Sequence, residues 1–218
     1  VPVVEALADE TEVSIDTSKA AVAVAALRAG ATIVNDVSAS LHHVAAEHGA
    51  GWVAMHCRGE PRTMQRHPRY EDVVAEVQHH LEERAEVGRA AGVERVWIDP
   101  GIGFGKTLRH NLQLLAHLDR LVGTGWPVAV GTSRKSSLGA LLGASDHRGR
   151  YQPGEGPGPV VAGTREVPPA PTDDRLEGSL ATATWALAQG VDLIRVHDVA
   201  PTVQALRVVT ADPEEEPS

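Results

Sequence analysis

The sequence predicts an α/β protein built as a TIM (β/α)8 barrel, and three observations lead to this prediction. Short runs rich in valine and isoleucine alternate with amphipathic stretches of helical length, a pattern typical of parallel sheets. Polar or chemically reactive side chains follow most of these runs, and barrels build their sites at the carboxyl ends of their strands. The chain has 218 residues, whereas a full barrel usually takes about 250, so we expect the first one to two βα units to be missing.

Six strands are expected, at residues 12–16, 32–35, 52–56, 95–99, 128–131 and 193–197. Helices are expected at residues 18–29, 41–48, 70–91, 108–122, 135–142, 175–189 and 202–209. The helices expected at 18–29, 70–91 and 175–189 have the firmest ends, because each is followed directly by a glycine that can take the left-handed conformation after the last turn. Periodicity alone also fits an open doubly wound sheet. The polar residues at so many strand ends favour the barrel.

One domain is expected over residues 1–211, interrupted by a loop insertion at 143–173. The insertion is rich in proline and glycine and has no periodicity, which predicts a mobile segment. It follows the fifth expected strand and would lie near the mouth of a site, although a solvated insertion is the simpler interpretation. Residues 212–218 form an acidic tail that we expect to be disordered.

Composition excludes several classes of partner. A net charge of −9 disfavours nucleic acid and anionic membranes, because like charges repel. No apolar run approaches the roughly 18 residues that suggest a membrane span, and the first residues lack a signal-peptide pattern. The single cysteine, Cys57, cannot form an internal disulfide. We therefore expect a cytoplasmic protein without nucleic-acid or membrane partners.

A glycine-rich turn follows the fourth expected strand, where residues 99–106 read Asp-Pro-Gly-Ile-Gly-Phe-Gly-Lys. Glycines let a backbone approach a flat or charged ligand closely. The spacing does not match a P-loop and fits a dinucleotide fingerprint poorly. Asp99 could accept hydrogen bonds from a ring N–H and an amino group of a heterocycle. A turn-stabilising aspartate is an equally good interpretation.

The fifth expected strand is followed by Gly-Thr-Ser-Arg-Lys at residues 131–135. Hydroxyl groups, two cations and a helix N-terminus together suit an anion or a carbonyl group. Lys135 could also form a Schiff base, as in barrel aldolases. A structural alternative for Ser133 and Arg134 is a helix cap with a surface salt bridge.

Arg195 and His197 alternate along the last expected strand and should point to the same face. Phosphate sites of barrels commonly lie beside the last strands, and an arginine fork binds phosphate oxygens bidentately. A buried structural pair of Arg195 with Asp198 is the alternative interpretation.

Asp16 and Asn35 end the first two expected strands. Their carboxylate and amide groups could form hydrogen bonds with the donors and acceptors along one edge of a ring. Either could instead cap a helix. His56 and Cys57 suggest zinc, but no second cysteine or histidine lies at metal-ligand spacing, so no zinc site is expected.

Six motifs, taken in order, resemble the dihydropteroate synthase family. They are Ser-Ile-Asp-Thr (14–17), Val-Asn-Asp-Val-Ser (34–38), Met-His-Cys-Arg-Gly-Glu-Pro-Arg-Thr-Met-Gln (55–65), the glycine-rich turn (99–106), Gly-Thr-Ser-Arg-Lys (131–135) and Arg-Val-His-Asp-Val (195–199). The resemblance implies a transferase of folate biosynthesis that joins (7,8-dihydropterin-6-yl)methyl diphosphate to 4-aminobenzoate. It also implies Mg²⁺, a homodimer and a sulfonamide target.

The same resemblance implies a role for each matching residue. The residues expected to bind the pterin are Asp16, Asn35, Met55, Asp99, Phe104, Gly131 and Lys135. Ser133 is expected near 4-aminobenzoate, Arg195 and His197 at the diphosphate, and Lys135, Arg195 and His197 in catalysis. The family's Asn-Val-Thr-Pro-Asp-Ser and Gly-Glu-Ser-Thr-Arg-Pro loops have no counterpart, so no ligand to the metal is expected in this chain.

Three alternatives stay open beside the synthase. One is a pterin-binding paralogue or fragment without activity, which the absence of those two loops favours. Another is a methyltetrahydrofolate-dependent methyltransferase of the same superfamily, which needs no diphosphate site. The third is an unrelated barrel aldolase, in which Lys135 would form the Schiff base.

Overall fold

The computed structural model describes residues 1–60, 63–142 and 170–211. Most of the expected loop insertion, residues 143–169, and the expected acidic tail lie outside the described residues. The chain divides into two compact units. Unit 1 comprises Val1–Gly131 and Gln189–Leu193, and unit 2 comprises Thr132–Ala188 and Ile194–Ser218.

Unit 1 is built on parallel strands that are neighbours in space in the order of the chain. The four-stranded sheet is β1 (Ser14–Asp16), β2 (Ile33–Asp36), β3 (Gly51–Met55) and β4 (Val96–Asp99). A parallel bridge between Ile98 and Val128 extends it toward β5 (Ala129–Val130), and Leu193, the first residue of β6 (Leu193–Ile194), donates to Val128 O at 3.1 Å. Doubly wound sheets reverse their strand order, whereas barrels do not. The consecutive order agrees with the barrel prediction.

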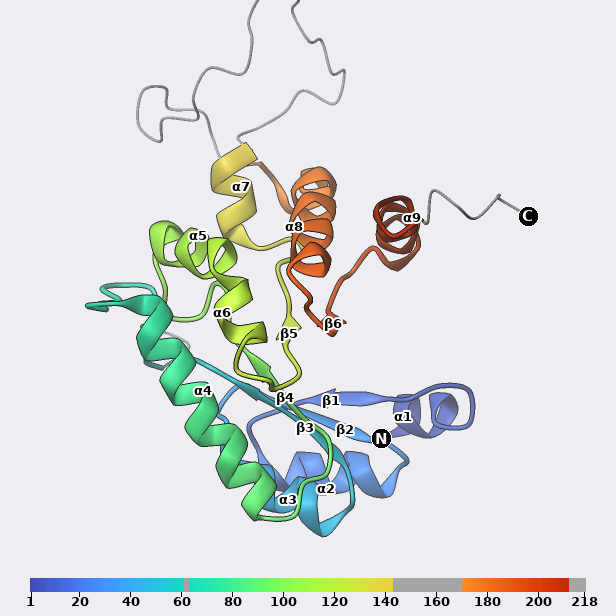
Figure 1. The fold of residues 1–218 in the computed structure, drawn as a ribbon. Helices are drawn as coiled ribbons and strands as arrows, with labels where there is room; N and C mark the ends of the chain where they lie inside the picture. Colours follow the sequence, from blue (N-terminus) through green and yellow to red (C-terminus); the bar gives the residue numbers. More distant parts are fainter. Residues whose placement is uncertain (61–62, 143–169, 212–218) are drawn as a thin grey trace, which may run out of the picture. The chain divides into compact units, whose positions relative to one another are not determined.

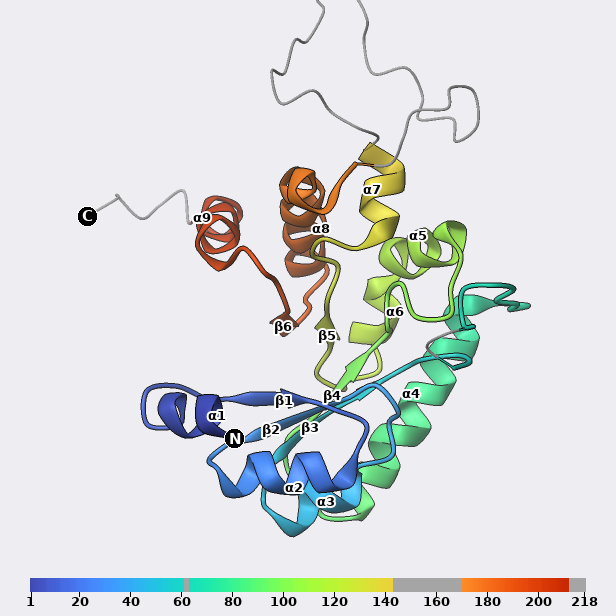
Figure 2. The same cartoon turned by 180° about the vertical axis from the view of Figure 1, so that it is seen from behind.

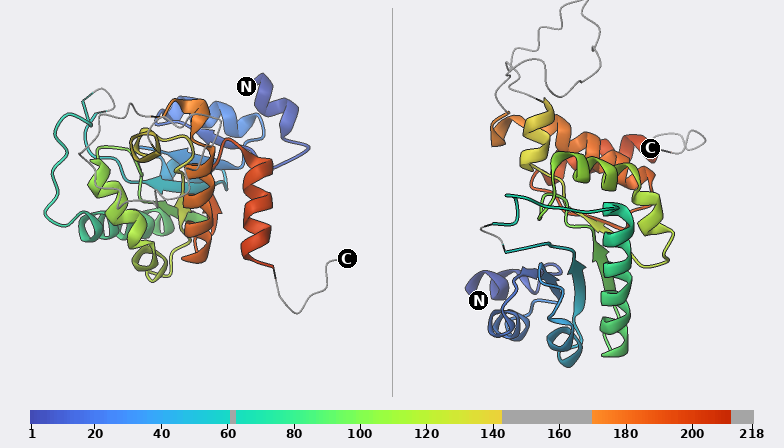
Figure 3. Two further views of the ribbon diagram at one scale, coloured as in Figure 1. Left: turned by 90° about the horizontal axis from the view of Figure 1, so that it is seen from above. Right: turned by 90° about the vertical axis from the view of Figure 1, so that its left-hand side faces the viewer.

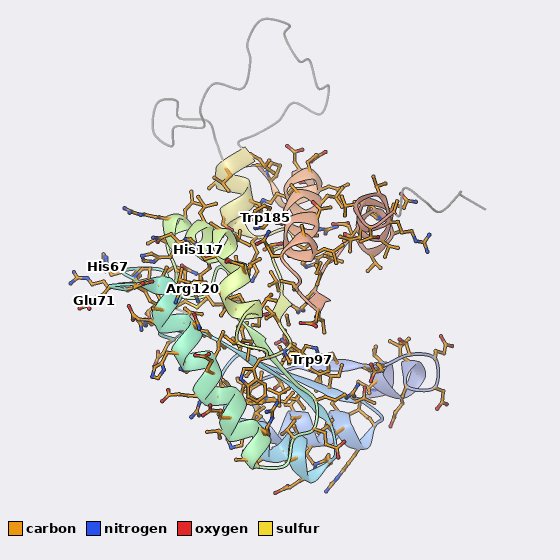
Figure 4. All side chains as sticks on the ribbon, viewed as in Figure 1. His67, Glu71, Trp97, His117, Arg120 and Trp185 are labelled. Atoms are coloured by element: carbon orange, nitrogen blue, oxygen red, sulfur yellow. The ribbon has the colours of Figure 1, made fainter. Side chains whose placement is uncertain are left out.

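The two faces of this sheet differ in what they bury. Ile33, Val53 and Ala129 share one face with Trp97 and Leu193. Figure 4 shows Trp97 projecting from β4 on the side away from α2 and α3. Side chains alternate along a strand, so Trp52 and Ile98, both fully buried, belong to the opposite face.

Six helices of unit 1 precede, flank or follow these strands among the described residues. They are α1 (Pro2–Leu7), α2 (Ala20–Arg28), α3 (His42–Glu47), α4 (Val73–Ala90), α5 (Leu108–Ala116) and α6 (Leu118–Val122). Figures 1 and 2 show α2 and α3 together on one face of the sheet, with α4 running alongside. Asp72 begins α4 by accepting hydrogen bonds from Val74 N and Ala75 N, both at 3.0 Å. The Asp72 side chain therefore caps the N-terminus of this helix.

Several expected boundaries are wrong. The helix expected at 108–122 is two helices that meet at His117, whose φ of −120° is not helical. Helix α2 begins at Ala20, because the Thr17 hydroxyl accepts from Lys19 N at 3.0 Å and holds the preceding turn. Helix α1 was not expected, although Pro2 in its first turn is a recognised start signal. Val4 anchors α1 against Ala26 and its neighbours.

Unit 2 contains α7 (Ser136–Leu142), a 3-10 turn (Thr172–Asp174), α8 (Leu176–Ala188) and α9 (Val199–Val209). Helix α8 lies beside both α7 and α9 (Figure 3). Helix α9 begins three residues before the expected start at Thr202, because Pro201 falls in its first turn, where proline is tolerated. Among the described residues, no helix combines the length and hydrophobicity needed to cross a membrane.

Candidate functional site

In unit 1, Asp16, Asn35, Met55 and Asp99 come together on one face of the sheet, at the carboxyl ends of β1 to β4. The register pairs Asp16 with Asn35 and Met55 with Asp99. Asn35 is also paired with Val53, two residues before Met55, so alternation places all four side chains on the same face. This face is the one expected for the pterin.

The neighbouring Asp36 explains why Asn35 is available on that face. Asp36 is fully buried on the opposite face and accepts from Ser40 N and Leu41 N, both at 2.7 Å, and from Trp52 Nε1 at 3.2 Å. It therefore holds the turn that leads into α3. The Asn35 amide instead donates to Asp16 Oδ2 at 3.0 Å. Neither Asp16 nor Asn35 caps a helix, so the capping alternative is wrong for both.

The glycine-rich turn packs on the chain segment that leaves β3. At Gly101, with φ of +63°, a Cβ atom would lie 1.9 Å from His56 O. At Gly105, also with φ of +63°, it would lie 2.1 Å from Arg58 O. Close backbone packing alone therefore requires glycine at both positions. Asp99 Oδ1 accepts from Gly101 N at 2.7 Å, so this carboxylate does stabilise the turn.

Lys106 ties this turn to the end of β3 from inside the protein. Its side chain is 3% exposed, and Nζ donates to Phe104 O at 3.0 Å, Gly101 O at 3.1 Å and His56 O at 3.3 Å. Nζ also lies 2.9 Å from His56 Nδ1. Burial, followed by the Lys106 charge, lowers the pKa of His56 to about 3. His56 is therefore neutral near pH 7, and its Nδ1 accepts a hydrogen bond from the Lys106 ammonium group.

The sequence did not predict that Lys106 holds the turn by hydrogen bonds or that His56 accepts one of them. His56 was weighed only as a zinc ligand, and Lys106 only as the last residue of a motif. Among residues 1–60, 63–142 and 170–211, no group of three histidine, cysteine or acidic side chains is placed to hold a metal ion. Two further residues expected at the pterin also belong to unit 1. Phe104 lies in the glycine-rich turn and is partly buried. Gly131 is the last residue of the segment Val1–Gly131.

Unit 2 brings Ser133 and His197 together. Ser133 is 6% exposed, and its Oγ accepts from His197 N at 3.2 Å and lies 3.0 Å from His197 Nδ1. His197 was expected on a strand, but β6 ends at Ile194, so Arg195 and His197 both follow the strand. The reason is that the His197 N–H bonds the Ser133 side chain instead of a neighbouring strand. Lys135 directly precedes α7 and is partly buried.

Arg134 makes the salt bridge that was the structural alternative for this segment. Its Nη2 and Nε donate to the two carboxylate oxygens of Asp198 at 2.6 and 3.1 Å. Hydrogen bonding from Arg134 lowers the pKa of the Asp198 carboxyl. Arg195 is exposed, so the buried Arg195–Asp198 pair considered from the sequence is wrong.

Comparisons with known proteins agree with the motifs. The family model described as "Pterin binding enzyme" matches residues 1–197. Dihydropteroate synthase of Escherichia coli (strain K12) is 41% identical over 97% of this chain and 68% of its own length. Dihydropteroate synthase of Thermus thermophilus has been solved in two separate complexes, one with 4-aminobenzoate and one with 6HMPPP. Each superimposes on this chain with a TM-score of 0.80 at 42% identity.

In the 4-aminobenzoate complex, that match covers 95% of this chain and 73% of the solved chain. The Yersinia pestis enzyme, solved with a sulfonamide drug, has a TM-score of 0.79 at 38% identity, over 95% of this chain and 69% of its own. With the consecutive strand order, these relatives confirm the predicted α/β fold of the TIM barrel class.

Proposed function

Because the chain belongs to the dihydropteroate synthase family, we propose that it condenses (7,8-dihydropterin-6-yl)methyl diphosphate with 4-aminobenzoate and releases diphosphate. The observation that carries this proposal is the common face of Asp16, Asn35 and Asp99 at the strand ends of unit 1. An amide and two carboxylates on one face match the ring N–H, amino and carbonyl groups along the edge of a pterin.

The pterin is read by these three side chains and confined by apolar neighbours. The bond from Asn35 Nδ2 to Asp16 Oδ2, at 3.0 Å, orients both groups before the ligand arrives. Preorientation lowers the entropy lost on binding. Met55, Phe104 and Gly131 shape the slot for the flat ring in this proposal, and Met55 is 6% exposed.

Unit 2 supplies the groups for the anionic parts of the substrates. Arg195 and His197 bind the diphosphate, Ser133 binds the carboxylate of 4-aminobenzoate, and Lys135 contributes a hydrogen-bond donor and a positive charge. Departure of diphosphate leaves positive charge on the pterin methylene, so groups that stabilise the departing anion lower the barrier. The amine then attacks that carbon, and no covalent enzyme intermediate is required. A Schiff base at Lys135 is not part of this proposal.

Mg²⁺ is proposed to accompany the diphosphate. The described residues form no cluster of three metal-binding side chains, so they do not by themselves make a magnesium site. Magnesium commonly keeps water ligands and binds mainly through substrate phosphates. The proposal is tested by comparing turnover in excess EDTA with turnover after Mg²⁺ is added back.

A homodimer is proposed to form through α9. Four valines of this helix, Val199, Val203, Val208 and Val209, are 40 to 77% exposed, and exposed apolar surface is a common mark of an interface. Light scattering after size exclusion would measure the mass of the assembly.

The cytoplasmic location stays a prediction from the sequence. We further propose that a sulfonamide competes with 4-aminobenzoate, as the drug complex of the Yersinia pestis relative suggests.

The first experiment is aminobenzoate-dependent release of diphosphate, with Arg195→Ala alongside. Turnover by the chain and its loss in the variant would support the synthase. Pterin binding without turnover would favour the paralogue or fragment, and methyl transfer from methyltetrahydrofolate would favour the methyltransferase. Trapping of a carbonyl substrate on Lys135 by borohydride would instead indicate an aldolase.

A further inference from the structure

Arg134 occupies a backbone conformation that arginine rarely adopts. Residues Thr132 to Lys135 form a β-turn in which Lys135 N donates to Thr132 O at 3.1 Å. Arg134 is the third residue of this turn and has φ of +58°. A positive φ at the third position is typical of type II turns, which place glycine or asparagine there. The surrounding structure must therefore hold Arg134 in place.

Three groups of unit 2 hold this residue. Arg134 N donates to Ser179 Oγ at 3.1 Å, and Arg134 O accepts from Arg175 Nη1 at 2.9 Å. The guanidinium group donates two hydrogen bonds to the Asp198 carboxylate, at 2.6 and 3.1 Å. Backbone donor, backbone acceptor and side chain are thus all engaged. Such complete restraint is expected where a backbone outlier serves a function.

These contacts close a ring that contains two of the proposed substrate-binding residues. Ser133 is bonded to Arg134 along the chain, Arg134 is paired with Asp198, Asp198 follows His197, and His197 bonds Ser133 at 3.0 Å. The two segments are 64 positions apart in the sequence. The position of His197 relative to Ser133 is consequently fixed at both sides, once by its own hydrogen bond and once through Asp198.

We propose that Arg134 is a positioning residue, which acts through Asp198 to hold His197 and Ser133 in the arrangement that binds the anionic substrate groups. This inference rests on the proposed function. A glycine at position 134 would satisfy the backbone but could not hold Asp198. A lysine would keep the charge but would lack the fork that engages both carboxylate oxygens.

The decisive variant is Asp198→Asn, because it separates positioning from simple charge. Removing a negative charge beside His197 should strengthen binding of an anion if electrostatics alone mattered. If Asp198 instead positions His197 through its hydrogen bonds with Arg134, the variant should bind the anion less tightly. We expect the Kd for inorganic diphosphate, measured by calorimetry, to rise about tenfold in Asp198→Asn and in Arg134→Gln. The double variant should be no worse than either single variant, because both break one link.

Steady-state kinetics on the same proteins give a second readout. We expect kcat to fall about tenfold in Arg134→Gln and Arg134→Gly, with both variants still folded by circular dichroism at the assay temperature. Arg120→Gln, at an exposed arginine on α6, is the matched control and should behave like the unmodified chain. Unchanged diphosphate affinity in Arg134→Gln, or tighter binding in Asp198→Asn, would overturn the inference.

The proposed function and the inference fail in different ways. An unmodified chain that binds diphosphate without turnover contradicts the synthase proposal, but the order of affinities among the variants still decides the role of Arg134. An unmodified chain that turns over while Arg134→Gln does so equally well contradicts only the positioning role. Absence of diphosphate binding in the unmodified chain contradicts both.

Discussion

The glycine-rich turn of unit 1 and the Ser-Arg-Lys turn of unit 2 are both held by a cation, but the two cations work in different surroundings. Lys106 is 3% exposed and donates to backbone carbonyls. Arg134 binds a carboxylate, and the two side chains are 38% and 25% exposed. Water and salt weaken the second contact much more than the first.

This difference matches what each turn is proposed to do. The pterin face needs a fixed backbone, and a buried ammonium group that organises carbonyl oxygens provides one. The anion-binding turn is held instead by an ion pair between two partly exposed side chains, and its proposed role is to position the groups that bind the anion. We therefore expect substitutions in the first turn to affect folding and substitutions in the second to affect binding.

The largest expected effect is that of Gly101→Ala. Its Cβ would lie 1.9 Å from His56 O, a backbone atom that cannot move without displacing the end of β3. We expect the free energy of unfolding, measured by urea denaturation, to fall by about 3 kcal/mol or more. Gly49→Ala is the control, because its φ is +62° and nothing lies within 4 Å of the place that its Cβ atom would take. It should lose only about 1 kcal/mol. Equal losses would contradict the packing explanation.

The next effect is that of Lys106→Met, which keeps most of the side-chain volume but removes the donor. The carbonyls of Gly101 and Phe104 and the Nδ1 atom of His56 would then lose that partner in a buried place. We expect a loss of about 2 to 4 kcal/mol in the free energy of unfolding. Lys19→Met, at an exposed position, is the control. A loss within 0.5 kcal/mol, roughly that of a surface change, would show that Lys106 does not hold the turn.

Acid should destabilise unit 1 through His56. Its folded pKa is about 3, below the unfolded value of about 6.5, so the unfolded state binds the proton first. Stability from this group is complete above pH 6.5 and is lost as the pH falls from 6.5 toward 3. The slope from one such histidine is at most about 1.4 kcal/mol per pH unit.

The test compares the pH dependence of urea denaturation in the unmodified chain and in His56→Asn between pH 7 and pH 5. The asparagine Oδ1 atom can still accept from Lys106, but it does not titrate. The slope should be shallower in the variant. His80 and His110 also have lowered pKa values, mainly through burial, and will leave some slope in both proteins. Parallel curves would exclude His56 as the acid-sensitive group.

Much of the fold could be predicted from the sequence, because its signals are local. Glycine follows the helices that end near Ala29, Ala91 and Gln189, as expected, and each of these glycines has a positive φ. The break at His117 could not be predicted, because neither glycine nor proline marks it. The end of β6 could not be predicted either, since Ser133, 64 positions away, takes the N–H of His197.

The same distinction applies to the site. Asp16, Asn35 and Asp99 stand at strand ends, so their shared face follows from strand periodicity and register. The roles of Lys106 and Arg134 depend on partners 41 to 64 positions away along the chain, such as His56, Arg175 and Asp198. A sequence pattern cannot identify such partners, since the fold alone brings them together.

The smallest expected effect concerns salt, and it tests the comparison of the two turns directly. The Debye length falls from about 10 Å at 0.1 M salt to about 3 Å at 1 M. The partly exposed pair of Arg134 and Asp198 should weaken over this range, so the difference in melting temperature between the unmodified chain and Arg134→Gln should shrink. The corresponding difference for Lys106→Met should persist, because its contacts are buried and go mainly to backbone oxygens. If the differences in melting temperature for Arg134→Gln and Lys106→Met shrink equally, burial does not explain how the two cations respond to salt.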